Sequence, residues 1–158
     1  MLLKDLGYVT IYKGTKGYIK LDHPDLLLEF LVIERGRGTN KPHPLPKLGV
    51  NAVALRFLNF LTIKTIKVKV EDFYLTLPHP ANFALHKLII FQRRLKEDKA
   101  SKDRNTAIEI LKALINKGES KMIRQVFDSV PKKWQLKIIQ GLSEPVDKDI
   151  LAVLSFQQ

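Results

Sequence analysis

The chain has 158 residues, of which 45% are hydrophobic and 27% charged, and it carries a formal net charge of +11 at pH 7. This length and apolar content suffice for a real core, in one domain or in a small domain with a helical appendage. The absence of cysteine excludes disulfides and thiolate metal sites.

No uninterrupted apolar run approaches the roughly 18 residues that a membrane-spanning helix needs. The start, MLLKDLGY, lacks the long apolar core of a signal peptide. We therefore expect a soluble protein of the cytoplasm, with no membrane partner.

Positive charge is spread over both halves of the chain. Residues 1–80 hold 12 basic and 7 acidic side chains, and residues 81–158 hold 15 and 9. Such an excess favours an anionic partner, either nucleic acid or polyphosphate. A lysine-rich solvated surface, as in thermophilic proteins, is the alternative explanation.

The first 61 residues predict short strands and one short helix. Residues 8–13 and 18–21 indicate strands separated by the glycine-containing turn GTKG. The DHPD turn then leads into 26–33, LLLEFLVI, which the apolar run predicts to be a buried strand. Residues 35–49 are rich in Gly and Pro and predict a loop. The sequence 51–61, NAVALRFLNFL, suggests a short buried helix.

Residues 64–77 predict a β-hairpin with one solvated face, because apolar and polar residues alternate in KTIKVKV and FYLTL. Glu71 and Asp72 would form its turn, and Pro80 would open a helix. Helices are predicted at 80–96, 100–117, 119–129, 131–141 and 147–156. The layout is that of an α+β protein, with a sheet domain at 1–79 and a helical domain at 80–158.

Lys87 is placed unusually for a lysine. Its neighbours three and four positions away on the predicted helix are all apolar: Phe83, Ala84, Ile90 and Phe91. The side chain could extend past them to water, or it could enter a cleft and meet a phosphate. Arg94, two turns on, would extend a positive stripe on the same side.

Two carboxylates are equally unusual. Asp103 leads the apolar stripe of the next predicted helix, where the helix dipole alone could explain it. Glu29 lies inside the apolar run 26–33 and shares a strand face with Leu27, Leu31 and Ile33. A buried, unpaired charge costs several kcal/mol, so Glu29 must face a partner, a metal, or solvent at a sheet edge.

Three segments resemble a known family: residues 77–94 (LPHPANFALHKLIIFQRR), 99–115 (KASKDRNTAIEILKALI) and 26–58. They are similar to the later part of nucleotidyltransferase-fold proteins distantly related to abortive-infection toxin nucleotidyltransferases. The resemblance covers roughly residues 5–117, and the stretch from Phe83 to Arg94 is its most specific part.

The resemblance implies a small mixed sheet that holds a nucleoside triphosphate, with two Mg²⁺ ions bound by an Asp-x-Asp/Glu pair. It places Glu29 at a third carboxylate that helps to activate the attacking hydroxyl. Lys87 matches a lysine that contacts the triphosphate, and Asp103 matches an aspartate on the following helix. The acceptor would be RNA, a nucleotide or a protein.

The sequence departs from this family in one respect. Nothing upstream of Glu29 supplies the Gly-Ser turn or the Asp-x-Asp pair, so the chain resembles a fold that lacks its first strand-and-helix unit, through truncation, a mis-started reading frame or degeneration. A non-catalytic nucleic-acid-binding module and a module that completes the sheet of a partner chain or a second copy remain the alternatives. We predict Glu29 and Asp103 as catalytic residues, and as substrate-binding residues Lys87, Arg93, Arg94 and Lys102.

Overall fold

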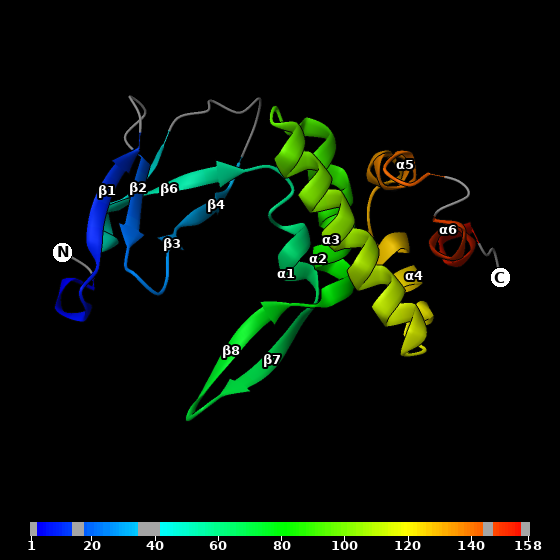
Figure 1. Cartoon of the computed structure of the whole chain (residues 1–158), viewed down its shortest axis with the longest axis horizontal. Helices are drawn as coiled ribbons and strands as arrows, with labels where there is room; N and C mark the ends of the chain where they lie inside the picture. Colours follow the sequence, from blue (N-terminus) through cyan, green and yellow to red (C-terminus); the bar gives the residue numbers. More distant parts are fainter. Residues whose placement is uncertain (1–2, 14–17, 35–41, 144–146, 156–158) are drawn as a thin grey trace. The chain divides into compact units, whose positions relative to one another are not determined.

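The computed structural model describes residues 3–13, 18–34, 42–143 and 147–155. The chain divides into two compact units, Met1–Asn59 and Phe60–Gln158. Short strands make up most of the first unit, and a hairpin with a group of helices makes up the second (Figure 1). The α+β class predicted from the sequence is confirmed.

Two small sheets form the first unit. One has the order β1-β2-β3 and is antiparallel, from Val9–Lys13, Tyr18–Asp22 and Leu28–Glu29. The other has the order β4-β6-β5, from Leu31–Ile33, Val50–Leu55 and His43–Leu45, with β4 parallel and β5 antiparallel to β6. Short 3₁₀ helices lie at Lys4–Leu6 and Pro46–Leu48. The buried core of this unit includes Leu21, Val50 and Ala52.

The predicted buried strand at 26–33 is wrong in two ways. The segment is split into β3 and β4, which belong to different sheets, and the face that carries Glu29 is exposed. Leu27, Leu31 and Ile33 on that face keep 45–48% of their surface accessible. The alternation itself is correct, because Leu28, Phe30 and Val32 are more buried. Glu29 therefore avoids the cost of burial by lying on the solvated side.

The predicted helix at 51–61 is also wrong. Residues 50–55 form β6, where Val50 and Ala52 alternate inward, and only Phe60–Ile63 is helical, as α1. A short apolar run fits a buried strand as well as a helix, so periodicity cannot separate them. Phe57, with φ of 63°, interrupts any continuous helix here. The predicted loop at 35–49 contains strand β5; its residues 35–41 lie outside the described part of the chain.

The predicted hairpin is confirmed as β7, Thr65–Val70, and β8, Phe73–Pro78, joined at Glu71 and Asp72. Figure 1 shows it extending away from the helices that follow. One face of the hairpin is apolar but only partly covered, with Phe73 52% exposed. The hairpin belongs to the same compact unit as the helices, Phe60–Gln158. The predicted division into a sheet domain and a helical domain at residue 80 stays a prediction.

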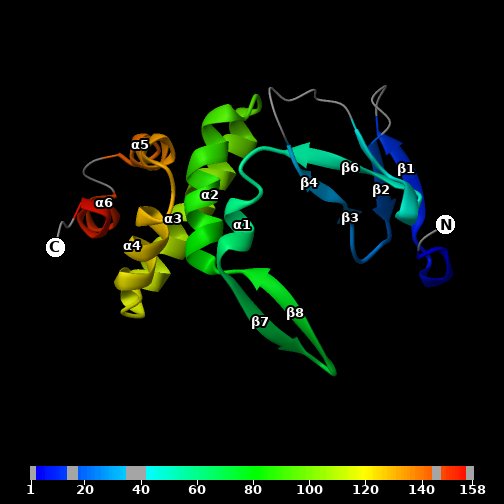
Figure 2. The same ribbon diagram turned by 180° about the vertical axis from the view of Figure 1, so that it is seen from behind.

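All five predicted helices are present: α2 (Pro80–Ile90, continued by a 3₁₀ turn at Phe91–Arg93), α3 (Glu97–Asn116), α4 (Ser120–Asp128), α5 (Lys132–Gln140) and α6 (Lys148–Ser155). Helix α2 packs against α1, α3, α4 and α5, and α2 and α3 lie side by side in both views (Figure 2). Leu85, Leu88 and Ile89 of α2 are fully buried. Across the described residues, each helix is too short or too polar to cross a bilayer.

Candidate functional site

Lys87 is positioned by the buried helix α2. Pro80 occupies the first turn, and the His79 side chain caps the helix by accepting a hydrogen bond from the Ala81 N–H at 3.2 Å. Because α2 is covered on most sides, a polar residue on it must find a partner within the fold. Lys87 does so near the C-terminal end of α2.

That partner is Asp103 of α3. Lys87 Nζ donates to Asp103 Oδ1 at 2.5 Å, and Arg94 Nε donates to Asp103 Oδ2 at 2.8 Å. Lys87 Nζ also lies 5.0 Å from the centre of the Phe83 ring, within cation–π range. Three of the predicted site residues thus form one cluster, which we call the Lys87–Asp103–Arg94 cluster.

The cluster is buried at one end and open at the other. The side chains of Lys87 and Asp103 are 16% and 10% exposed, whereas that of Arg94 is 44% exposed. Burial of Asp103 raises its pKa, but the hydrogen bonds and positive charges of Lys87 and Arg94 outweigh this and lower the pKa below its ordinary 3.8. Asp103 is therefore ionised at neutral pH, and the cluster carries a net charge of +1.

Lys87 and Arg94 both have hydrogen-bond donors that their contacts with Asp103 do not use and that could bind an anion. Among the described residues, the contacts of Arg94 to charged groups use only its Nε, and those of Lys87 use one of three ammonium donors. Arginine and lysine with free donors are the groups that proteins use to bind phosphate oxygens. The arrangement is thus chemically suited to a phosphate chain.

The other predicted residues lie outside the cluster. Arg93 ends the 3₁₀ turn after α2, and Lys102 precedes Asp103 on α3; both are exposed. Glu29 lies on the exposed face of β3, opposite Lys20 in the strand register, and belongs to the other compact unit. Its predicted convergence with Lys87 and Asp103 stays a prediction.

The described residues do not supply a ready set of magnesium ligands. No group of three His, Asp or Glu side chains comes together among them, and Asp103 is already paired with two cations. An Asp-x-Asp sequence does occur at Asp147–Asp149, but Asp147 is fully buried and Asp149 is exposed. These two carboxylates therefore face different environments and do not form a shared metal site.

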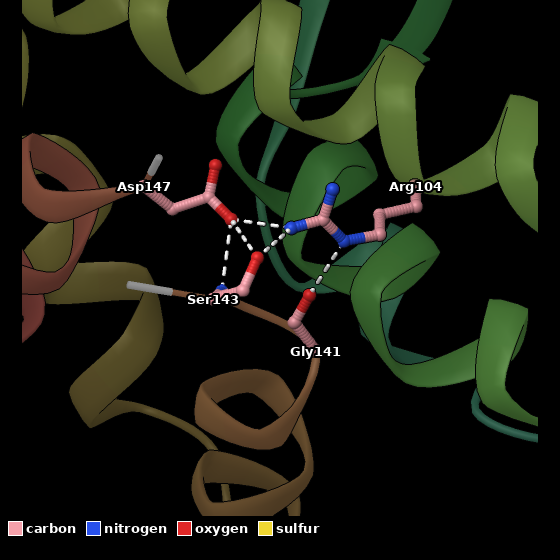
Figure 3. Close-up of polar contacts among 4 residues, drawn as sticks. All are labelled: Arg104, Gly141, Ser143 and Asp147. Atoms are coloured by element: carbon pink, nitrogen blue, oxygen red, sulfur yellow. Dashed lines mark hydrogen bonds and ion pairs between the residues drawn. The ribbon is translucent and has the colours of Figure 1, made fainter. Parts of the chain in front are cut away.

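Sequence reasoning missed a second charged cluster, next to Asp103 on α3. Arg104 donates from Nε to the Gly141 carbonyl at 3.0 Å and from one terminal nitrogen to Ser143 Oγ at 2.9 Å and to Asp147 (Figure 3). Asp147 also accepts from the Ser143 N–H at 2.9 Å. This network ties α3 to the segment between α5 and α6. An aspartate at the first position of the helix predicted at 147–156 was the available signal.

Comparison with known proteins identifies a family whose matched segment includes the Lys87–Asp103–Arg94 cluster. A protein-family model described as "Nucleotidyltransferase" matches residues 12–130, which include the end of β1, strands β2 to β8, helices α1 to α4 and the Lys87–Asp103–Arg94 cluster. Neither a curated protein nor a solved structure gives a significant match. Since the matched segment spans most of the sequence, the chain belongs to this nucleotidyltransferase family.

Proposed function

We propose that the chain acts in the transfer of a nucleoside monophosphate from a nucleoside triphosphate to a hydroxyl group, as in the abortive-infection toxin nucleotidyltransferases that its sequence resembles. The observation that carries the proposal is the family match over residues 12–130, which includes a partly open cationic cluster. RNA is the acceptor class that best suits a net charge of +11, and a cytoplasmic location belongs to the proposal.

In this reaction the acceptor oxygen forms a bond to the α-phosphorus, the bond from that phosphorus to the β-phosphate oxygen breaks, and pyrophosphate leaves. Lys87 and Arg94 would bind the phosphates and offset their charge, with Arg93 and Lys102 at the exposed rim. Glu29 would take the proton of the acceptor hydroxyl, and Asp103 would orient the nucleotide. The described residues do not fit the Mg²⁺ ions that the resemblance implies, because no three His, Asp or Glu side chains among them come together as ligands.

The direct test is transfer of label from an α-³²P-labelled nucleoside triphosphate to RNA, with Mg²⁺ present. Lys87→Ala and Arg94→Ala should each reduce transfer and reduce the thermal shift that the triphosphate produces. Lys121→Ala is the matched control, because Lys121 is an exposed lysine on α4. Equal shifts for wild type and Lys87→Ala would contradict the assignment of the site.

A second candidate function is nucleic-acid binding without catalysis. It is favoured by Lys96, Lys99 and Lys102, which are exposed near the start of α3 and make no ion pair with described residues. Binding through such lysines should weaken steeply with salt and depend little on base sequence. Salt-sensitive binding without label transfer would favour this function.

Sheet completion with a partner chain or a second copy is a third candidate. Strands β3 and β4, which each lie at the edge of a sheet in the described part of the chain, favour it. The exposed side chains of Leu27, Leu31 and Ile33 lie in or next to these strands. A monomer at micromolar concentration in sedimentation would speak against self-association.

A further inference from the structure

The Asp103 carboxylate occupies the space between two cations that the proposed function assigns to the phosphates of a substrate. Its two oxygens are used separately, Oδ1 by Lys87 and Oδ2 by Arg94. A carboxylate held in this way makes charge-assisted hydrogen bonds of the kind that a phosphate makes. Without a ligand, the protein therefore already supplies its own anion.

We propose that Asp103 is an internal counter-ion that competes with the phosphate chain of a nucleoside polyphosphate for Lys87 and Arg94. The inference rests on the proposed function for the identity of the ligand. It also assigns Asp103 a role opposite to that of orienting the nucleotide, because an orienting residue strengthens binding and a competing residue weakens it.

The two cations would respond differently to the ligand. Lys87 lies on the buried helix α2, next to Phe83, and has little freedom to move. Arg94 follows the last 3₁₀ turn, has extended backbone geometry and is 44% exposed. Arg94 is thus the cation that can leave Asp103 first and turn towards an arriving phosphate.

Asp103 also orders the side chains of Lys87 and Arg94. Its removal therefore has two opposing effects on anion binding: it loses this ordering, and it removes a negative charge that repels the anion. The ordering of these two side chains is worth less than the repulsion between a carboxylate and a polyphosphate bound to the same cations. Acid cannot release the carboxylate near neutral pH, because its pKa is lowered. Lys87 and Arg94 are therefore released from Asp103 by competition from the ligand.

The experiment measures binding of sodium tripolyphosphate by calorimetry, without divalent metal and at low ionic strength. Asp103→Asn should raise the affinity by about tenfold, and Asp103→Glu, which keeps the charge, should stay close to wild type. Glu109→Gln is the matched control, since it removes one exposed negative charge from the same helix and should leave the affinity unchanged. An unchanged or lower affinity of Asp103→Asn would overturn the inference, and so would a lack of binding by this variant.

A second measurement on the wild type covers the case in which Asp103→Asn does not fold. The side-chain carboxyl ¹³C resonance of Asp103 should move as tripolyphosphate displaces its partners, and a resonance unchanged at saturation would overturn the inference. Both readouts use a probe without nucleoside or metal. Failure of the label-transfer assay would therefore refute the proposed function, whereas failure of the tripolyphosphate experiments would overturn the competition inferred here.

Discussion

Lys87 of α2 and Asp103 of α3 form a short ion pair, with 2.5 Å between Nζ and Oδ1, inside the packed helical unit. The pair links α3 to α2, the helix that carries most of the specific part of the sequence resemblance. It is shielded more than a surface ion pair, since both side chains are less than one-fifth exposed. Its loss should therefore be visible in the stability of the protein.

Lys87→Met should destabilise the protein by about 2–3 kcal/mol, because it leaves Asp103 with Arg94 as its only cation. The double variant Lys87→Met/Asp103→Leu should recover most of this loss, since it leaves no buried charge unpaired; Arg94, which also loses Asp103, is 44% exposed to solvent. Urea denaturation followed by circular dichroism measures both values. A double variant less stable than Lys87→Met would contradict the explanation.

The lowered pKa of Asp103 predicts a specific loss of stability in acid. The folded-state pKa lies below the ordinary value of 3.8, so the unfolded chain binds this proton more readily. The stabilisation is complete above about pH 4 and disappears as the pH falls through the folded-state pKa.

The stability difference between wild type and Asp103→Asn should therefore be largest near neutral pH and shrink as the pH falls below 3.8. Denaturant titrations at several pH values measure this difference directly. Glu109→Gln, in which an exposed carboxylate is removed, should show no comparable trend. A difference between wild type and Asp103→Asn that is independent of pH would exclude Asp103 as the titrating group.

Arg104 should matter for stability and not for phosphate binding. Its removal leaves the fully buried Asp147 without its cation, so Arg104→Ala should cost about 3 kcal/mol or more. Arg104→Lys should rescue little, because one ammonium cannot reproduce the fork to Gly141 and Ser143. Hydrogen exchange should become faster in α6, and Lys99→Ala, an exposed change on α3, should leave exchange unchanged.

Gly141 is required by close packing at the end of α5. A Cβ atom there would lie 2.8 Å from Phe91 Cε1 and 3.1 Å from the Leu88 carbonyl oxygen. Gly141→Ala should therefore lower the unfolding free energy by about 1–3 kcal/mol. Adding Phe91→Leu should relieve part of the clash; a thermal melt in which the second change brings no recovery would contradict this.

The helical unit could be predicted from the sequence, and the first unit only in part. Proline, glycine and long apolar stripes mark the ends and faces of helices α2 to α6, so these follow from local chemistry. Residues 50–55 form a strand because β4 and β5 pair with them on both sides. Such pairing between distant segments leaves no clear local signal in a short apolar run.

The candidate site shows the same limit. The sequence identified Lys87 and Asp103 because each is a charged residue on an apolar helix face. It could not show that they neutralise each other, since that contact depends on how α2 packs against α3. Asp147 went unrecognised because its partner Arg104 is 43 positions away along the chain.

A substitution of Glu29 can distinguish an effect on catalysis from an effect on stability, because the Glu29 side chain lies on an exposed sheet face. Glu29→Gln should change the unfolding free energy by less than about 0.5 kcal/mol, as expected for an exposed substitution. If Glu29 takes the acceptor proton, the same change should reduce label transfer by about 10²-fold or more, since general-base catalysis contributes rate factors of this size. Asp25→Asn is the control, because Asp25 is a highly exposed carboxylate of the same unit, and it should alter neither quantity. Normal transfer by Glu29→Gln would remove Glu29 from the mechanism, whereas a large loss of stability would show that this carboxylate has a structural role.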